Sequence, residues 1–178
     1  DGRTKTCPLY PLTALVLLSA RQPVILQGGK RMPVKYGVSS TELFEAIGLK
    51  LDGLPIKEVQ NGFNKFGFAC IHQPDHFPLA DTLIPYRDEI GKRPTLSSME
   101  LIWTAHKGEH IIISGFFHLP TELNSWKALE MIGEKNLITI KGLEGGTDLP
   151  ISRKSIIGEI SRSGLQRLTL NSRDYNCF

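Results

Sequence analysis

Residues 22–31, QPVILQGGKR, decide the fold prediction because they join a short strand to a glycine-rich basic loop. Their β-branched residues favour an extended strand, and the adjacent glycines Gly28 and Gly29 let the backbone turn with positive φ and approach a ligand closely. Ser39 and Glu42 then have the spacing of a capping box, which predicts a helix after the loop. The order of strand, glycine-rich loop and helix is typical of an α/β protein.

Helix and strand patterns alternate through the rest of the chain. We predict helices over residues 11–20, 39–48, 55–66, 77–91 and 121–132, and strands over residues 22–26, 67–71, 111–116, 137–140 and, as an edge strand, 168–170. Because the first helix is apolar on all sides, we expect it to be buried. The alternation predicts the α/β class with a mainly parallel sheet flanked by helices. Ligands of such sheets bind at the carboxyl ends of the strands, so loops 27–37 and 142–148 are expected at one sheet edge.

The composition fits a globular protein with one sizeable core. The chain has 178 residues, of which 40% are hydrophobic and 22% charged. We assign residues 1–150 to one α/β domain and residues 151–178 to a C-terminal extension of that domain, truncated at its end. The first residues are neither an initiator methionine nor a signal peptide, so we expect the chain to begin within a longer sequence.

We expect a soluble protein in a reducing compartment. The sequence contains no run of about 18 apolar residues, the length that would indicate a membrane span. The three cysteines, Cys7, Cys70 and Cys177, show no C-x-x-C spacing, so they suggest neither a disulfide framework nor a zinc site. We therefore expect the cytoplasm, or the plastid stroma if the source is a plastid-bearing organism, and no membrane partner.

The basic loop is a candidate anion site. Lys30 and Arg31 follow Gly28 just before a helix N-terminus, an arrangement that favours a phosphate or another anion. A tight turn with exposed basic tips explains the same residues equally well. The net charge is only +3, but residues 1–40 carry six basic residues against the single acid Asp1. That excess indicates either an anion-binding face or a solvated charged surface.

A second glycine-rich loop carries two acids directly after the predicted strand 137–140. Glu144 and Asp148 are candidates for holding Mg²⁺, which proteins usually bind through one or two carboxylates plus substrate phosphates. A flexible acidic loop without a ligand is the alternative. Arg87 would suit bidentate capture of a carboxylate, although a surface salt bridge is the simpler interpretation of its acidic neighbours.

No other motif points to a known chemistry. The five histidines lack the spacing of metal ligands, and we expect most of them to be structural or exposed: His72, His76, His106, His110 and His118. The sequence contains no Gly-x-Ser-x-Gly, no Walker loop and no His-Glu-x-x-His.

Taken in order, these blocks resemble the catalytic domain of the anthranilate phosphoribosyltransferase family, in the nucleoside phosphorylase-like group of glycosyltransferase family 3. Asp1 and Gly2 resemble the end of the family's Gly-Thr-Gly-Gly-Asp-Gly diphosphate loop. Residues 23–31 resemble the family's strand together with the Lys-His-Gly-Asn-Arg that follows it. Lys35 and Gly37 resemble the Ser-Lys-Ser-Gly that closes this loop.

Two further blocks belong to the resemblance, which runs from Asp1 to about Pro150. Residues 44–48, FEAIG, are similar to the family's Leu-Glu-Ala-Leu-Gly. Residues 87–91, RDEIG, are similar to its Arg-Lys-Glu-Leu-Gly, whose arginine contacts the carboxylate of anthranilate. The resemblance therefore implies that Arg87 binds the acceptor.

Two departures indicate a divergent branch. The family's Asn-x-Ser-Thr, which helps to hold the ribose-phosphate donor, aligns with residues 7–10, CPLY. The family's acidic Asp-Glu pair appears as Thr147 and Asp148, so one carboxylate is missing unless Glu144 substitutes for it. Similar losses occur in divergent relatives, some of which bind nucleic acid and lack the parent activity.

The resemblance implies the α/β domain of the family fold without its N-terminal helical domain, and pentosyl transfer from phosphoribosyl pyrophosphate to an aromatic amine such as anthranilate, as in tryptophan biosynthesis. Mg²⁺ is the implied cofactor, held by Glu144 and Asp148, and a homodimer through the missing helices is the implied assembly. The implied donor-side residues are Asp1, Gly2, Gly28, Lys30, Arg31 and Lys35, with Arg87 on the acceptor side. The alternative is a non-catalytic nucleic-acid-binding member whose same cations meet a phosphate backbone.

Overall fold

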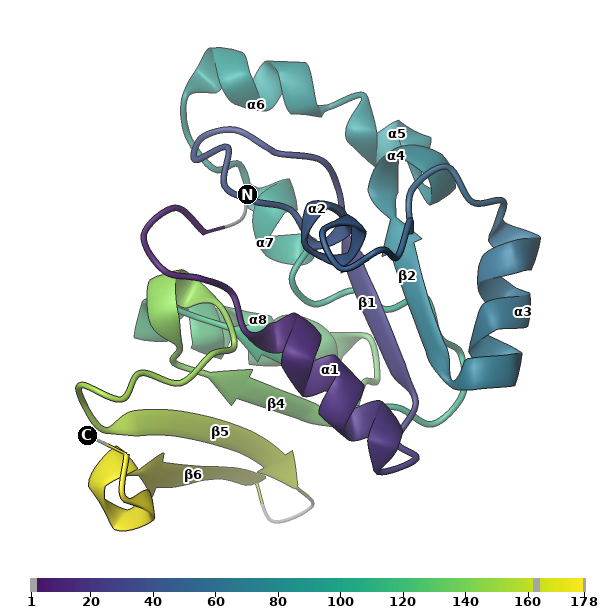
Figure 1. Ribbon diagram of the computed structural model, residues 1–178. Helices are drawn as coiled ribbons and strands as arrows, with labels where there is room; N and C mark the ends of the chain where they lie inside the picture. The colour runs from purple at the N-terminus through teal and green to yellow at the C-terminus, as the bar shows by residue number, and fades with distance from the viewer. Residues whose placement is uncertain (1–2, 162–163, 178) are drawn as a thin grey trace. The chain divides into compact units, whose positions relative to one another are not determined.

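The computed structural model describes residues 3–161 and 164–177 of the chain (Figure 1). They form two compact units, Asp1–Arg93 and Pro94–Phe178, and each is described below by itself. Asp1 and Gly2 lie outside the described residues. Among the described residues, no helix has the length and apolar character needed to cross a bilayer.

The first unit is built on a parallel pair of strands, β1 (Val24–Gly28) and β2 (Phe68–His72). The helices α2 (Ser40–Glu45) and α3 (Ile56–Phe66) lie in the crossover between these strands (Figure 1). The register pairs Gly28 with His72, so both strands end side by side at the same edge. This edge is where the loop of residues 29–39 leaves the sheet.

Helix α2 begins as the sequence predicts but ends at Glu45, before the predicted end near Gly48, whereas α3 ends at Phe66 as predicted. The Ser39 side chain accepts from the Glu42 N–H at 3.4 Å, and the Glu42 carboxylate accepts from the Ser39 N–H at 2.8 Å, which completes the capping box of α2. Helix α3 ends at Gly67, whose φ of 72° is the left-handed conformation that a glycine adopts without strain.

Helix α1 (Tyr10–Ser19) forms where predicted, but the expectation that it is buried was wrong. Only Pro11 and Ala14 are buried, whereas Leu12 and Val16 are 59% and 66% exposed. The physical reason is that a helix packed on one side buries only the side chains of that side. Its other side chains stay exposed even when they are apolar.

The stretch predicted as one helix over residues 77–91 is divided into short helices. After β2 come α4 (Gln73–His76), α5 (Pro78–Asp81) and α6 (Ile84–Ile90). Each has a proline in its first turn. Proline has no N–H to donate to the preceding turn, so it starts a new helix more readily than it continues one.

The second unit contains a four-stranded sheet in the order β3-β4-β5-β6. Strands β3 (Ile112–Gly115) and β4 (Leu137–Ile140) are parallel and joined through α8 (Leu119–Met131). The remaining strands, β5 (Ser155–Ser161) and β6 (Gly164–Leu170), form an antiparallel hairpin on β4. The short elements are α7 (Thr95–Met99), η1 (Leu143–Gly145) and η2 (Ser172–Tyr175).

The predicted α/β class is confirmed, and both strand pairs joined by a helical crossover are parallel. The predicted edge strand 168–170 is the end of β6. The described strands nevertheless form two sheets, and β5 was not predicted. The domain boundary at residue 150 stays a prediction.

The core of the second unit joins α8 to its sheet. Trp126 and Leu129 of α8 pack against Ile112 of β3 and Leu137 of β4. Beside them lies Glu122, a fully buried carboxylate.

The Glu122 carboxylate has two partners from the sheet. It accepts a hydrogen bond from Thr139 Oγ1 at 2.8 Å and from Arg167 Nη2 at 2.5 Å. One acidic side chain therefore ties α8 to both β4 and β6.

Candidate functional site

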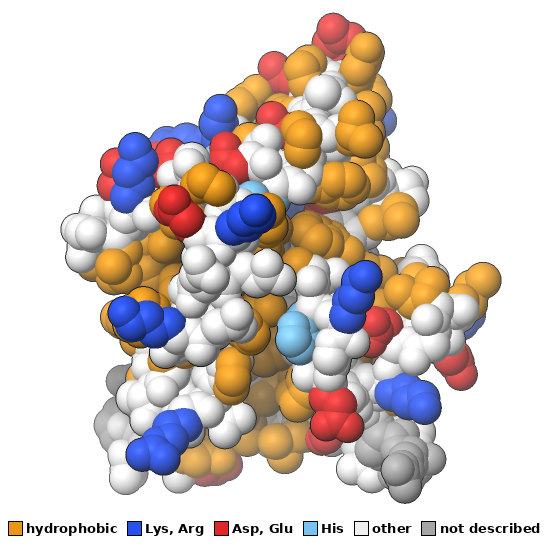
Figure 2. Space-filling view, turned by 90° about the vertical axis from the view of Figure 1, so that its right-hand side faces the viewer, with side chains coloured by type: hydrophobic (Ala, Val, Ile, Leu, Met, Phe, Trp, Pro, Cys, Tyr) orange, Lys and Arg blue, Asp and Glu red, His pale blue; other side chains and the backbone are white. Residues whose placement is uncertain are grey.

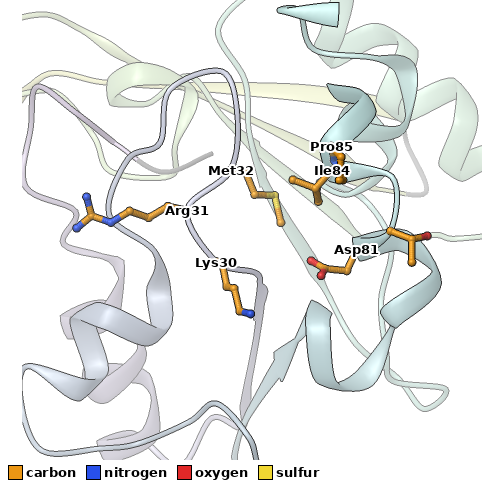
Figure 3. Close-up of a pocket in the computed structure, with 7 residues that line it drawn as sticks. Lys30, Arg31, Met32, Asp81, Ile84 and Pro85 are labelled. Carbon is orange, nitrogen blue, oxygen red and sulfur yellow. The ribbon is translucent and has the colours of Figure 1, made fainter. Parts of the chain in front are cut away.

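A hollow of about 370 Å³ lies in the first unit, between the loop after β1 and the helices α5 and α6 (Figure 3). Its size is within the range of small-molecule sites. The lining combines charged side chains with an apolar floor and consists of Lys30, Arg31, Met32, Asp81, Thr82, Ile84 and Pro85. The loop comes directly from the carboxyl end of β1, where ligands of parallel sheets are expected.

Two side-chain contacts hold this loop in place. The Arg31 guanidinium extends away from Met32 (Figure 3) and meets the Glu42 carboxylate of α2 at 2.8 Å. The Tyr36 hydroxyl donates to Asp88 of α6 at 2.6 Å. The loop is thus tied to α2 at one point and to α6 at the other.

These contacts shift two pKa values. The pKa of Glu42 is lowered, chiefly because the Ser39 N–H donates to its carboxylate and also because Arg31 lies beside it. The pKa of Tyr36 is raised, mainly because its hydroxyl proton is held by Asp88. Each shift favours the protonation state that keeps the loop tied.

Neither Gly28 nor Gly29 has the positive φ that the sequence suggested, so that expectation was wrong. A Cβ on Gly29 would overlap the Cε methyl of Met32, and a Cβ on Gly28 would lie 3.4 Å from Ser40 Oγ. Gly29 therefore provides the room in which the Met32 side chain lies. The loop is a turn with exposed basic side chains that borders the hollow, and its role as an anion site stays a prediction.

Arg87 is only 3% exposed, so the interpretation as a surface salt bridge was wrong. Its Nη1 donates to the sulfur of Met32 at 3.5 Å. Met32 itself is 6% exposed and lines the hollow. The arginine that the resemblance assigns to the acceptor thus lies next to the hollow, in contact with one of its lining residues.

A hydrogen-bonded group at the end of β2 was not predicted from the sequence. His72 is 2% exposed, and its Nδ1 lies 2.6 Å from the Asp75 carboxylate. Among the described residues, nothing hydrogen-bonds to its Nε2. The pKa of Asp75 is lowered, first by the bond from His72 and further by the Gly53 N–H at 2.6 Å. A histidine at a strand end, three residues before an acid, was the available signal.

The acidic loop of residues 142–148 is tightly folded. The Leu143 N–H donates to the Asp148 carbonyl at 2.8 Å, and Asp148 is 8% exposed. A Cβ on Gly115, at the end of β3, would overlap the backbone carbonyls of Gly145 and Gly146. The loop is therefore packed closely against the end of β3, and the choice between a metal-binding loop and a loop without a ligand stays a prediction.

The structure shows no ready-made metal cage. Within residues 3–161 and 164–177, no group of three or more His, Cys, Asp or Glu side chains lies close enough to hold an ion. The acidic loop offers Glu144, with a left-handed φ of 52°, and the buried Asp148. Mg²⁺ is usually bound through one or two carboxylates together with substrate phosphates, and whether Glu144 and Asp148 hold it stays a prediction.

The structure brings some of the predicted residues together. Lys30 and Arg31 line the hollow, and Arg87 contacts its wall through Met32. Lys35 is exposed on the same loop. Glu144 and Asp148 belong to the second unit, so their place at the same site stays a prediction.

Two of the six basic residues at the start of the chain are engaged by neighbouring side chains. Arg3 is 6% exposed and donates to Thr6 Oγ1, and Arg31 is paired with Glu42. On the face drawn in Figure 2, the Lys and Arg side chains stand singly among acidic and apolar ones. This face is a mixed charged surface, and the choice between an anion-binding face and a solvated surface for residues 1–40 stays a prediction.

Comparison with known proteins identifies similar chains, although no family model matches. The curated anthranilate phosphoribosyltransferase of Verminephrobacter eiseniae is 21% identical over 170 residues, covering 96% of this chain and 47% of that protein. That of Paracidovorax citrulli is 23% identical with the same coverage. Anthranilate phosphoribosyltransferase 1 of Ralstonia nicotianae is 22% identical over 175 residues, covering 98% of this chain and 49% of that protein.

A solved structure supports the same fold. The crystal structure of anthranilate phosphoribosyltransferase from Thermus thermophilus matches with a TM-score of 0.74 at 20% identity. The match covers 95% of this chain and 48% of the other chain. The chain thus spans about half the length of the relatives that it matches, and the resemblance found in its sequence is confirmed.

Proposed function

We propose that this chain, which resembles anthranilate phosphoribosyltransferases over nearly its whole length, is the substrate-binding α/β part of a pentosyltransferase. The reaction is transfer of a phosphoribosyl group from phosphoribosyl pyrophosphate to an aromatic amine such as anthranilate, as in tryptophan biosynthesis. The observation that carries this proposal is the hollow beside the glycine-rich basic loop at the carboxyl end of β1.

The two walls of the hollow suit the two substrates. Lys30 stands on the loop wall, where a cation attracts the pyrophosphate of the donor. Ile84 and Pro85 stand on the wall from α6, where apolar surface suits an aromatic ring. The separation of cationic and apolar walls would set the donor beside the acceptor.

The proposed chemistry needs no covalent intermediate with the protein. The amine nitrogen forms a bond to the anomeric carbon of the ribose while the bond from that carbon to pyrophosphate breaks. Pyrophosphate leaves with the bonding electron pair, and the amine gives up a proton. The protein contributes by holding the two substrates in line and by neutralising the charge that develops on the pyrophosphate.

Magnesium belongs to this proposal as the cofactor. Glu144 and Asp148 are the residues that would hold it together with the pyrophosphate oxygens, and the ion would neutralise charge on the leaving group. The departure at Thr147, where the family has an acid, makes Asp148 the residue to test first.

Calorimetry of the full-length protein with phosphoribosyl pyrophosphate, with and without Mg²⁺, tests the proposal. We expect binding that requires Mg²⁺, about tenfold weaker in Lys30→Ala because one charge-assisted contact is lost. Asp148→Ala should remove the donor binding that requires Mg²⁺, whereas Asp174→Ala, which changes an exposed acid elsewhere in the second unit, should not. An intact protein that binds no donor under any of these conditions would contradict the proposal.

A further inference from the structure

We infer that Met32 sets the class of acceptor, favouring an aromatic amine without a carboxylate over anthranilate itself. This inference rests on the proposed function, because it concerns the acceptor side of the same hollow. It starts from the position of one thioether, which lies between the hollow and the guanidinium of Arg87.

The thioether has contacts on both of its sides. Met32 lines the hollow, and its side chain points across it toward Ile84 and Pro85 (Figure 3). Its sulfur also accepts from Arg87 Nη1 at 3.5 Å. Since Arg87 is 3% exposed and does not itself line the hollow, a ligand there meets the thioether before it meets the guanidinium.

The surface that a ligand meets is therefore apolar where the resemblance leads one to expect a cation. Met32, Ile84 and Pro85 give an apolar floor that suits an aromatic ring. A carboxylate placed against this floor would lose its water, and the floor itself offers it no charged partner. A ring without a carboxylate carries no such penalty.

The charges at the rim favour the same class of ligand. Asp81 lines the hollow, and its carboxylate points into it (Figure 3). An amino group can donate to Asp81, whereas an acceptor carboxylate is repelled by it. Lys30 is the cation at this rim, but it comes from the loop wall assigned to the donor. Arg31 is directed away, toward Glu42.

Gly29 explains why Met32 can lie in this position. A Cβ at residue 29 would overlap the Met32 Cε methyl, so the absence of that atom leaves room for the thioether. The unbranched Met32 side chain is flexible enough to change its rotamer when a neighbour changes. Shortening it should open a path from the hollow to Arg87.

The experiment compares two ligands, aniline and anthranilate, on the full-length protein saturated with phosphoribosyl pyrophosphate and Mg²⁺. Calorimetry is used because its readout does not depend on turnover, with pyrophosphate replacing the donor if the amines react during titration. We expect the wild-type protein to bind aniline at least tenfold more tightly than anthranilate. Met32→Ala should strengthen anthranilate binding by about tenfold or more and reverse the preference.

Met32→Leu is the matched control, since leucine keeps the apolar bulk and should keep the preference for aniline. Circular dichroism establishes that each variant is folded. A wild-type protein that prefers anthranilate would overturn the inference, as would a Met32→Ala variant with an unchanged ratio. So would a failure of both proteins to bind either amine.

The proposed function is tested separately by the donor titration. Loss of donor binding would reject pentosyl transfer, while the ratio of the two amines, repeated without donor, would still test the role of Met32. Donor binding together with an anthranilate preference would reject the role of Met32 alone.

Discussion

Asp75 shows how one side chain can order the end of a strand. Its carboxylate binds the His72 ring at 2.6 Å and the Gly53 N–H at 2.6 Å, so it joins the end of β2 to the turn before α3. The His72 N–H in turn donates to the His76 ring at 3.0 Å, and His76 bonds to the Leu54 carbonyl at 2.8 Å. This network lies beside Gly28 at the start of the basic loop.

Asp75→Asn should destabilise the first unit by about 1 kcal/mol at pH 7, since bonds to a charged group are worth more than neutral ones but this side chain is partly exposed. Because folding lowers the pKa of Asp75, its contribution is present above the unfolded pKa of about 3.9 and is lost as the pH falls through the folded value. Urea unfolding from pH 7 to pH 3 measures this. Glu45→Gln, an exposed change on α2, is the control. A deficit in Asp75→Asn that stays constant across the range would contradict the account.

At the scale of elements, the buried Glu122 joins α8, β4 and β6 through Thr139 and Arg167. Arg167→Met removes the charged partner and leaves the carboxylate in the core. Removing one member of a buried pair costs about 3–5 kcal/mol, but the Arg167 side chain is 36% exposed, so we expect about 2 kcal/mol.

Urea unfolding followed by tryptophan fluorescence measures this loss, because Trp126 packs in the same core. Arg173→Met, which removes a nearby exposed arginine, is the control. Unfolding midpoints that match for the Arg167 and Arg173 variants would show that the carboxylate does not depend on Arg167.

The elements found from sequence were those with local signals. The capping box at Ser39, the αL glycine Gly67 and the alternation around residues 137–140 each depend on a few neighbouring residues. The hairpin β5–β6 depends on pairing with β4, and Gly158 interrupts the pattern of β5.

The candidate site also combines residues that a local sequence pattern reveals with residues that only tertiary contacts bring together. Lys30 and Arg31 were predicted from composition, since cations beside glycines are visible in one sequence. The position of Met32 between the hollow and Arg87 depends on residues 55 apart in the chain, so no local pattern could reveal it. The His72 and Asp75 pair had a local spacing, but its meaning depends on burial.

At the scale of the whole molecule, the net charge and the state of the basic residues help to distinguish a transferase from a nucleic-acid-binding module. The net charge is +3, and within the first 40 residues Arg3 is buried and Arg31 is paired with Glu42. We therefore expect the full-length protein to bind single-stranded DNA weakly, with a shallow dependence on salt. Fluorescence anisotropy from about 50 to 200 mM salt measures the slope.

Lys30→Ala and Lys50→Ala, an exposed change outside the loop, should alter this slope equally. Tight DNA binding whose slope falls by about one phosphate in Lys30→Ala alone would favour the nucleic-acid module.

The two ties of the basic loop, from Arg31 to Glu42 and from Tyr36 to Asp88, have a consequence for the thermodynamics of recognition. A loop that is ordered before its ligand arrives does not lose that conformational freedom on binding. Its affinity then comes from a favourable enthalpy that is little opposed by entropy, and association is not delayed by a folding step. Without the hydrogen bond from Tyr36 to Asp88, the loop would regain conformational freedom. Each binding event would then have to reduce that freedom again.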